Sequence, residues 1–506
     1  MSIIKEKFKR KKKEKIFDLK IDVKDFGPIS SGKIKLKPLT LFIGPNNSGK
    51  SYASMLIHSI LESYVPTFPT DLPRFMRRHF FAGYLDRDFS LQQLSELKGI
   101  IGNIKENKEI DIPKNFIKKI IKKIFEEIYE KRLSEEIIRS YACPLNELVR
   151  VGKKTFELGI NFNSYHTLLV YQKNGVKIKK YPRVDIKIKF KIVESYRPII
   201  NVQESKNEIL IELSRLWRER ESSKFHHLQI MDIISEVCVS HIFKDIAKPC
   251  YYLPAARSGI LQGHRALAAS IVRKAPYVGI ERLPEIPKFS GVVSDFISSI
   301  LTLPEEKSPF YELAKDFEKE LIKGEILVRP LDEYLGPEIK YRFMDTEIPL
   351  HRASSTVSEL APLFLYLKYT IDKDSILIIE EPEAHLHPQN QRILAKFLVK
   401  MIRNGLNIII TTHSEYLLEQ LNTFILLSKI KPKDRKELYE YTEEDFLKPE
   451  EVAAYVFEYD QSGAGNNIAE IDITEEDGIS QEEFLKIHEA LYEEAFRIRK
   501  SLNNKD

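Results

Sequence analysis

Residues 41–51 read Leu41-Phe42-Ile43-Gly44-Pro45-Asn46-Asn47-Ser48-Gly49-Lys50-Ser51. They match G-x-x-x-x-G-K-[ST], the pattern of a phosphate-binding loop. The apolar run 39–43 predicts a strand before the loop, and the helix-forming run 51–62 predicts a helix after it. Because such a loop needs both neighbours, the agreement of all three segments favours a phosphate site in an α/β fold over a chance match in a Gly/Asn-rich turn.

Each part of this loop has a chemical purpose. The two glycines let the backbone curl so that its N–H groups point at phosphate oxygens. Lys50 neutralises the outer phosphates, and the hydroxyl of Ser51 is a candidate ligand of Mg²⁺. The N-terminus of the following helix adds positive potential. The candidate phosphate-binding residues are Gly44, Pro45, Asn46, Asn47, Ser48, Gly49, Lys50 and Ser51.

Length and composition limit the class of protein. The 506 residues provide room for two or three domains, and 43% hydrophobic with 30% charged residues is typical of a globular protein. No run of about 18 apolar residues predicts a membrane span. Three cysteines without a C-x-x-C pair predict a cytoplasmic location and argue against a zinc site. The net charge of +5 is too small to indicate nucleic-acid binding by itself.

The first 17 residues form a lysine- and arginine-rich tail. Two interpretations are open. It is either a solvated, disordered tail or an arm that contacts nucleic-acid phosphate.

The remaining chain divides by pattern into three parts. Residues 18–69 hold the phosphate loop, residues 70–248 form an inserted helical and β lobe, and residues 249–506 complete the nucleotide-binding unit. Within the lobe, apolar residues at helical spacing predict a helix over 114–139, and strict alternation predicts a strand over 184–192.

A second strong signal is the run 375–383. Four consecutive apolar residues predict a strand buried on both faces, as in a parallel sheet, and Glu380 and Glu381 follow it. In a nucleotide site the first carboxylate would hold Mg²⁺ or its water, and the second would polarise the attacking water. A strand that ends in an acidic turn is the alternative.

The run 406–414 repeats this design, because a buried strand there delivers His413. We expect this strand beside the carboxylate strand, with the histidine near the γ-phosphate or the attacking water. A structural histidine is the alternative. His385 and His387 form an H-x-H pair, which we interpret as part of the loop after the carboxylates rather than as a metal site.

Two further segments carry candidate residues. The hydroxyl-rich turn 353–362 precedes an apolar helix, and Ser358 is the expected cap. This turn either places Ser354, Ser355 and Ser358 on a phosphate or only caps the helix. Arg257 follows the apolar run 250–253 and either reaches a phosphate or a partner subunit, or is a surface arginine in a structural pair.

In order, GPNNSGKS, SSTVSEL, ILIIEEPEAHLHP and IIITTHSEYL resemble the ABC-type ATPase heads of the SMC, RecF and OLD group of AAA-family proteins. The resemblance covers residues 18–60 and 350–420 and implies a bacterial or archaeal source. It implies a P-loop NTPase head with a mixed sheet, interrupted by the inserted lobe. In this group two heads enclose two ATP molecules.

The resemblance implies a role for each matched residue. Lys50 and Ser51 would bind phosphate and Mg²⁺, Glu380 would stand in the metal shell, and Glu381 would be the catalytic base. His413 would be the switch histidine, and Ser354, Ser355 and Ser358 would form the signature loop that meets ATP in the opposite subunit.

The sequence departs from the family pattern in several places. Glu380 stands where aspartate is usual, and Thr356-Val357 stands where the signature has a glycine. No long heptad run or C-x-x-C hook follows the phosphate loop, and no leading glutamate with a D-x-D pair indicates a Toprim nuclease. Gly463 and Gly465 predict a hairpin turn rather than a second phosphate loop.

The resemblance implies an ATP-hydrolysing dimer that drives or gates a separately encoded effector such as a nuclease or toxin, in phage defence or DNA repair. DNA is an open candidate for a further partner. The alternative is an ATP-dependent scaffold that assembles an effector with little turnover. The ATPase subunit of a membrane transporter fits less well, because of the large lobe and the altered signature.

Overall fold

The computed structural model describes residues 19–64, 95–97, 99–100, 108–162, 165–172, 175–181, 186–193, 200–205, 208–214, 224–243, 246, 248–263, 289–329, 338–438, 441–459 and 465–503. The predicted basic tail, residues 1–17, lies outside the described residues, as does Gly463.

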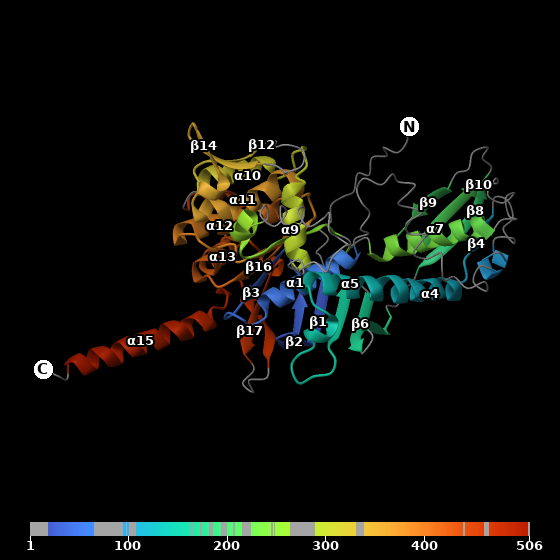
Figure 1. Cartoon of the computed structure of the whole chain (residues 1–506), viewed down its shortest axis with the longest axis horizontal. Helices are drawn as coiled ribbons and strands as arrows, with labels where there is room; N and C mark the ends of the chain where they lie inside the picture. Colours follow the sequence, from blue (N-terminus) through green and yellow to red (C-terminus); the bar gives the residue numbers. More distant parts are fainter. Residues whose placement is uncertain are drawn as a thin grey trace, which may run out of the picture.

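A mixed sheet forms the centre of the molecule (Figure 1). Within the described residues it has eleven strands, in the spatial order β11 (Cys250–Leu253), β15 (Ile376–Glu380), β16 (Asn407–Thr412), β3 (Leu39–Ile43), β17 (Val452–Tyr459), β18 (Asn466–Ile471), β2 (Ile29–Lys35), β1 (Leu19–Phe26), β5 (Glu157–Phe162), β6 (Tyr165–Gln172) and β7 (Gly175–Lys180). The first five strands of this order are parallel. The other half is antiparallel apart from the β18–β2 pair.

The parallel strands separate two hydrophobic cores. Every residue of β15 is buried. Ile376 and Ile378 belong to the core on one face of the sheet, and Leu377 and Ile379 belong to the core on the other. Since burying each such side chain contributes about 1.5–3 kcal/mol, the strand is anchored on both faces and its carboxyl end is firmly placed.

Different helices cover the two faces. The first core includes α1 (Lys50–Tyr64), α4 (Lys114–Lys123), α5 (Glu130–Tyr141) and α7 (Lys224–Phe243). The second includes α10 (Tyr311–Leu321), α11 (Ser355–Leu365), α12 (Pro388–Arg403) and α13 (Glu415–Leu427). Residues of α9 (Gly291–Leu301) contribute to both cores.

The predicted insertion, residues 70–248, divides between two sheets. Strands β5 to β7 extend the central sheet, because β5 pairs with β1. A separate sheet has the order β4 (Glu109–Asp111), β8 (Lys187–Val193), β10 (Glu208–Ser214) and β9 (Ile200–Glu204). The helix predicted over 114–139 is confirmed as α4 and α5, joined by a π-helical segment, η1 (Ile124–Tyr129). The domain boundaries themselves stay predictions.

The described part of the chain also contains smaller elements, besides the helical residues 95–97 and 257–263. They are the sheet β12 (Glu325–Arg329), β13 (Glu338–Phe343) and β14 (Thr346–Pro349), the pair β19 (Ile473–Thr474) and β20 (Gly478–Ile479), and the short helices η2 (Leu145–Leu148), η4 (Leu350–Arg352), η5 (Tyr366–Thr370), α14 (Pro432–Arg435) and η6 (Pro449–Glu451).

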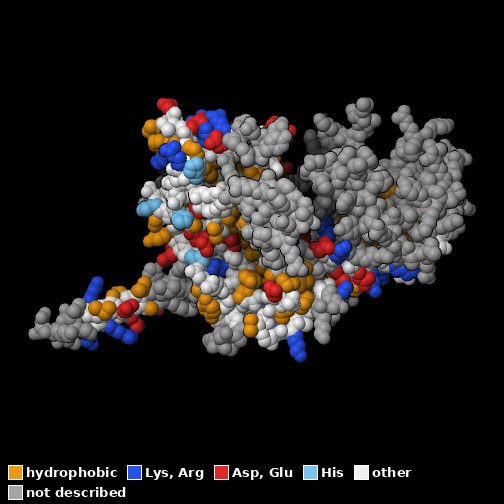
Figure 2. Space-filling model, in the orientation of Figure 1, with side chains coloured by type: hydrophobic (Ala, Val, Ile, Leu, Met, Phe, Trp, Pro, Cys, Tyr) orange, Lys and Arg blue, Asp and Glu red, His pale blue; other side chains and the backbone are white. Residues whose placement is uncertain are grey.

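The C-terminal helix α15 (Glu482–Asn503) extends away from the body (Figure 1). Its apolar side chains Leu491, Tyr492, Phe496 and Ile498 are exposed, as the orange atoms along it show in Figure 2. Within the described residues, no helix has both the length and the apolar character needed to cross a membrane.

Candidate functional site

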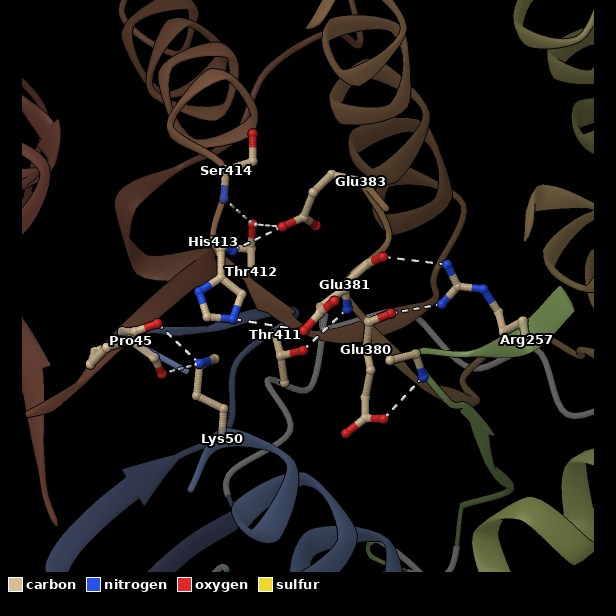
Figure 3. A network of polar contacts seen from close by, with 12 residues as sticks. Pro45, Lys50, Arg257, Glu380, Glu381, Glu383, Thr411, Thr412, His413 and Ser414 are labelled. Atoms are coloured by element: carbon tan, nitrogen blue, oxygen red, sulfur yellow. Dashed lines mark hydrogen bonds and ion pairs between the residues drawn. The ribbon is translucent and has the colours of Figure 1, made fainter. Parts of the chain in front are cut away.

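The predicted site follows three neighbouring parallel strands at one edge of the central sheet (Figure 3). The register places Glu380 of β15 opposite Thr411 of β16, and Thr412 of β16 opposite Ile43 of β3. The carboxyl ends of the three strands are therefore level, and the loops that follow them meet. In open α/β sheets, ligands bind outside this edge.

Glycine is required in the phosphate loop because of its backbone shape. Gly44 has φ +141° and Gly49 has φ +101°, in the region that favours glycine. A Cβ on Gly44 would also lie 2.6 Å from the carbonyl oxygen of Phe457 on β17. The ammonium of Lys50 donates to the carbonyls of Gly44 and Pro45, at 3.0 and 2.7 Å, so the loop curls around the head of this lysine.

Burial changes the electrostatics of Lys50. Its side chain is buried, and this desolvation lowers its pKa to about 8, although the carboxylates of Glu381, Glu383 and Glu380 favour the charged form. The rest of the loop is partly open to solvent. Pro45, Asn46, Asn47 and Ser51 are exposed, whereas Ser48 and Gly49 are buried.

Glu381 occupies an unusual backbone conformation. Its φ is +43°, which is uncommon for a residue with a side chain. Its amide donates to the carbonyl and the hydroxyl oxygen of Thr411, at 3.0 and 3.1 Å. Its carboxylate is 3.7 Å from Nε2 of His413 (Figure 3). Burial and then the charge of Lys50 lower the pKa of His413, so the imidazole is mainly neutral at pH 7.

Glu380 points to the opposite side of the strand end and is buried. Its Oε2 accepts from the amide of Ala255, at 3.1 Å. Its Oε1 is buried without a hydrogen-bond partner among the described residues. A buried carboxylate oxygen of this kind suits a cation or its water, and Mg²⁺ is usually held by one or two carboxylates with phosphate oxygens and water. The donor set of Glu380 and Ser51 therefore fits Mg²⁺ bound with a nucleotide.

Sequence reasoning missed Glu383. Its Oε1 accepts from the hydroxyl of Thr412 at 2.7 Å and from the amide of His413 at 2.8 Å. It therefore ties the loop after β15 to the end of β16. Burial raises its pKa. Its position in the run Glu-Glu-Pro-Glu gave no signal that separated it from a surface acid.

The three candidate serines stand at the start of α11, where Ser354 precedes the helix and Ser355 and Ser358 belong to it. Ser354 and Ser355 are exposed. Ser354, and not Ser358 as predicted, is the N-cap, and its hydroxyl accepts from the amide of Val357. Ser358 lies one turn inside the helix, where it is buried and donates to the carbonyl of Leu350 at 3.1 Å. The capping prediction failed because several hydroxyls in this turn satisfy the capping pattern, and the helix begins at Ser355, one turn before the predicted start.

Of the interpretations of Arg257, the structural pair is confirmed, because Arg257 pairs with Glu359, but the surface position is wrong. Its side chain is 2% exposed, so it is no surface arginine, and it donates to the main chain of Glu380 and Glu381 rather than reaching outward. His387 caps α12, its Nδ1 accepting from the amide of Gln389 at 3.3 Å. His385 has φ +61° in the loop after the carboxylates, where it was predicted.

The chain was compared with family models, curated proteins and solved structures. A family model described as an AAA ATPase domain matches residues 19–418. No curated protein matches.

Three solved structures show similarity at low identity. An SMC head bound to the C-winged helix domain of ScpA has a TM-score of 0.38 and 10% identity, covering 90% of this chain and 98% of its own. The SMC head domain from Thermotoga maritima has a TM-score of 0.30 and 11% identity, and the match covers 90% of this chain and 98% of that domain. The third structure is an Smc head domain with an extended coiled coil, bound to the C-terminal domain of ScpA derived from Pyrococcus furiosus. Its TM-score is 0.33 and its identity 12%, and the match covers 94% of this chain and 100% of that chain. Since the family model spans most of the sequence, the chain belongs to the AAA ATPase domain family.

Proposed function

We propose that the chain binds ATP with Mg²⁺ at the carboxyl ends of β3, β15 and β16 and hydrolyses it to ADP and phosphate. One observation carries this proposal. Lys50, Glu381 and His413, which are far apart in sequence, meet at one sheet edge in a member of an ATPase domain family. Phosphoryl transfer uses a lysine that holds the phosphates and a base or water-positioning residue that orients the attacking water. Lys50 and Glu381 fit these roles, and His413 lies beside Glu381.

The phosphate loop and its lysine would hold the triphosphate. When nucleotide binds, Lys50 would donate to phosphate oxygens instead of the carbonyls of Gly44 and Pro45. The buried ammonium would then have negatively charged partners, which form stronger hydrogen bonds than neutral carbonyls. Ser51 and Glu380 would hold Mg²⁺, which when bound neutralises charge on the phosphate oxygens.

Glu381 and His413 would act on water. The carboxylate of Glu381 accepts the proton of the attacking water, and the peptide bonds around it fix its direction. The neutral imidazole of His413, whose amide is held by Glu383, orients the water or a terminal phosphate oxygen.

We also propose that two copies pair through their nucleotide sites. The exposed Ser354 and Ser355 stand at the N-terminus of α11, where the helix dipole and free N–H groups favour phosphate. They would meet the nucleotide bound by the other copy. Ser358 would support this contact from below, by holding η4 through Leu350.

The proposed output is a separately encoded effector, such as a nuclease or toxin, that the ATP cycle drives or gates in the cytoplasm. Phage defence or DNA repair is the proposed setting. The motif resemblance in residues 18–60 and 350–420 supports both statements. An ATP-dependent scaffold with little turnover is the competing function.

Substitution of the proposed base separates these functions. We expect Glu381→Gln to lower multiple-turnover ATP hydrolysis about 100-fold or more, with ATP affinity retained. Glu320→Gln, a change of an exposed acid on α10, is the matched control and should leave turnover unchanged. Full turnover in Glu381→Gln would contradict the catalytic assignment. A wild-type protein that binds ATP and hydrolyses none, with or without DNA, would establish the scaffold.

The pairing of two copies is tested by measuring the molecular mass of the protein in solution. Glu381→Gln should double its mass in light-scattering measurements when Mg²⁺ and ATP are added, because the closed state cannot be resolved by hydrolysis. Ser355→Arg in the same background should stay at the mass of one copy. A protein whose mass ignores ATP in both variants would exclude pairing through the nucleotide.

A further inference from the structure

The turn after the edge strand β11 contacts the catalytic loop and α11 at the same time. Residues 254–256 form the turn itself and lead into the helical segment 257–263; residues 254–258 are called the turn below. The turn follows β11, which lies beside β15 in the central sheet. Arg257 points from this turn toward the carbonyl oxygens of Glu380 and Glu381 (Figure 3). The contacts of this one side chain connect two parts of the site that are otherwise separate.

On one side, Arg257 holds the main chain of the carboxylate pair. Its Nη1 donates to the carbonyl of Glu380 at 2.7 Å, and its Nη2 donates to the carbonyl of Glu381 at 3.3 Å. Nη1 also donates to the carbonyl of Pro254, at 3.1 Å, which closes the turn. The amide of Ala255 in the same turn holds the carboxylate of Glu380. The planar guanidinium therefore fixes two successive peptide bonds at once.

On the other side, the same turn holds Glu359 in the second turn of α11. Nε of Arg257 donates to the carbonyl of Glu359 at 3.1 Å and lies 3.4 Å from its carboxylate. The amide and the hydroxyl of Ser258 both donate to Glu359 Oε1, at 3.3 and 2.5 Å. Both members of the Arg257–Glu359 pair are nearly inaccessible to solvent. A buried pair of this kind tolerates little displacement, because a separated charge would be left without a partner.

The backbone of Glu381 gives these contacts a consequence. A positive φ at a residue with a side chain persists only where its surroundings enforce it. Thr411 holds the amide of Glu381, and Arg257 holds its carbonyl. Without the second of these, the peptide is free to rotate toward an ordinary conformation, and the carboxylate moves away from His413.

We propose that Arg257 and Glu359 are positioning residues that link the placement of α11 to the geometry of Glu381. A shift of α11, whose first turn carries Ser354 and Ser355, changes the carbonyl that Nε of Arg257 holds. The guanidinium then moves its two other contacts on the carboxylate loop. The base is thereby set for hydrolysis only when α11 is correctly placed. This inference rests on the proposed ATPase function, since it assigns a regulator to that same site.

The test compares two buried arginines. Arg435 is equally buried and donates to the carbonyls of Leu427, Ile430 and Glu443, away from the site. We expect Arg257→Gln to lower kcat for ATP about 100-fold, the cost of a base displaced by about 1 Å, with the Kd for nucleotide within about threefold of wild type. Arg435→Gln should lose comparable thermal stability and keep kcat within about twofold.

Two more variants separate positioning from simple folding. Arg257→Lys keeps the charge, but one compact ammonium cannot reach the carbonyl of Glu359 and those of Glu380 and Glu381 together, as the guanidinium does. Its kcat should therefore fall between wild type and Arg257→Gln. The effects of Arg257→Gln and Glu359→Gln on kcat should be strongly non-additive in the double variant, because each acts through the other. Additive effects, or a fall in kcat no larger than in Arg435→Gln at equal stability, would overturn the proposal. A raised Kd with unchanged kcat would overturn it too.

A readout without turnover keeps this test distinct from that of the proposed function. Amide hydrogen exchange of the nucleotide-free protein should accelerate at Glu381 in Arg257→Gln and stay unchanged there in Arg435→Gln. If the wild-type protein hydrolyses no ATP, the proposed hydrolysis fails, and this measurement still decides whether Arg257 holds the loop. Equal exchange at Glu381 in both variants would show that it does not.

Discussion

Nε2 of His413 lies 3.7 Å from Oε1 of Glu381, across the gap between the ends of β16 and β15. The two side chains approach because neighbouring parallel strands end level with one another and each continues into a tight turn. Neither strand places its polar residue correctly without the other. The predictions below test this arrangement and the groups that support it.

Removing the imidazole should slow hydrolysis more than binding. We expect His413→Ala to lower kcat about 100-fold, while KM for ATP changes little, because Lys50 and the loop amides still hold the phosphates. Steady-state kinetics measures both. His413→Gln, which retains a hydrogen-bonding side chain of similar reach, should recover part of kcat. A rise in KM at unchanged kcat would instead place His413 in binding.

The ionisation of Lys50 should limit ATP capture at alkaline pH. Since burial lowers its pKa to about 8, the free protein loses this charge as pH rises through that value. kcat/KM, which reports the free protein, should fall about tenfold per pH unit above about pH 8. In Lys50→Arg the fall should be absent whatever the absolute rate, because guanidinium keeps its proton. A wild-type profile that is flat to pH 10 would contradict the assignment.

Glu383 should matter through His413. Glu383→Ala frees the hydroxyl of Thr412 and the amide of His413, so we expect kcat to fall about tenfold with ATP affinity retained. Both bonds go to one oxygen, Oε1, and Glu383→Gln keeps an amide oxygen there that can accept both, so it should show a smaller loss. Equal losses in the two variants would indicate that the charge of Glu383, rather than its hydrogen bonds, is what the site uses.

The half-buried carboxyl of Glu62, on α1, should make stability depend on pH. Glu62 lines a cavity of 440 Å³ with Glu136, Arg139 and Asp295, and burial, followed by Asp295 and Glu136, raises its pKa from 4.5 to about 7. The folded protein holds this proton more tightly than the unfolded chain. The free energy of unfolding should therefore fall as pH rises from about 4.5 to about 7.

Glu62→Gln has no carboxyl to ionise, so it should remove the fall in the free energy of unfolding between about pH 4.5 and about 7. It should raise the free energy of unfolding by about 2 kcal/mol at pH 8 and have little effect at pH 5. Urea unfolding at the two pH values measures the difference. The exposed Glu320→Gln serves as the control at both. The same gain at pH 5 as at pH 8 would show that packing, and not ionisation, is responsible.

Much of the fold follows from local pattern. The runs before the phosphate loop, before Glu380 and before His413 are confirmed as neighbouring parallel strands, and the hairpin of β17 and β18 is confirmed as well. The α/β class with a mixed sheet and the AAA ATPase family are also confirmed. Buried apolar runs and glycine turns are properties of short segments, so one sequence reveals them.

The side-chain contacts between segments that are distant in sequence were not predicted. Arg257 and Glu359 are about a hundred residues apart, and Glu383 acts on the end of a different strand. Such pairings depend on which strands become neighbours, and the hydrophobic periodicity of a segment does not indicate which other segment it will lie beside. The cap of α11 was missed for a related reason. Several hydroxyls in one turn satisfy the capping pattern, and the preceding turn η4 selects Ser354.

Strand β3 lies between β16 and β17, both of which come from the last quarter of the chain. During synthesis on the ribosome, the N–H and C=O groups along both edges of β3 therefore remain unpaired while several hundred further residues are added. Pairings between such distant segments form slowly, and unpaired strand edges promote aggregation. The nascent chain consequently carries a strand with unpaired edges through most of translation, and this exposure should end only when β17 emerges.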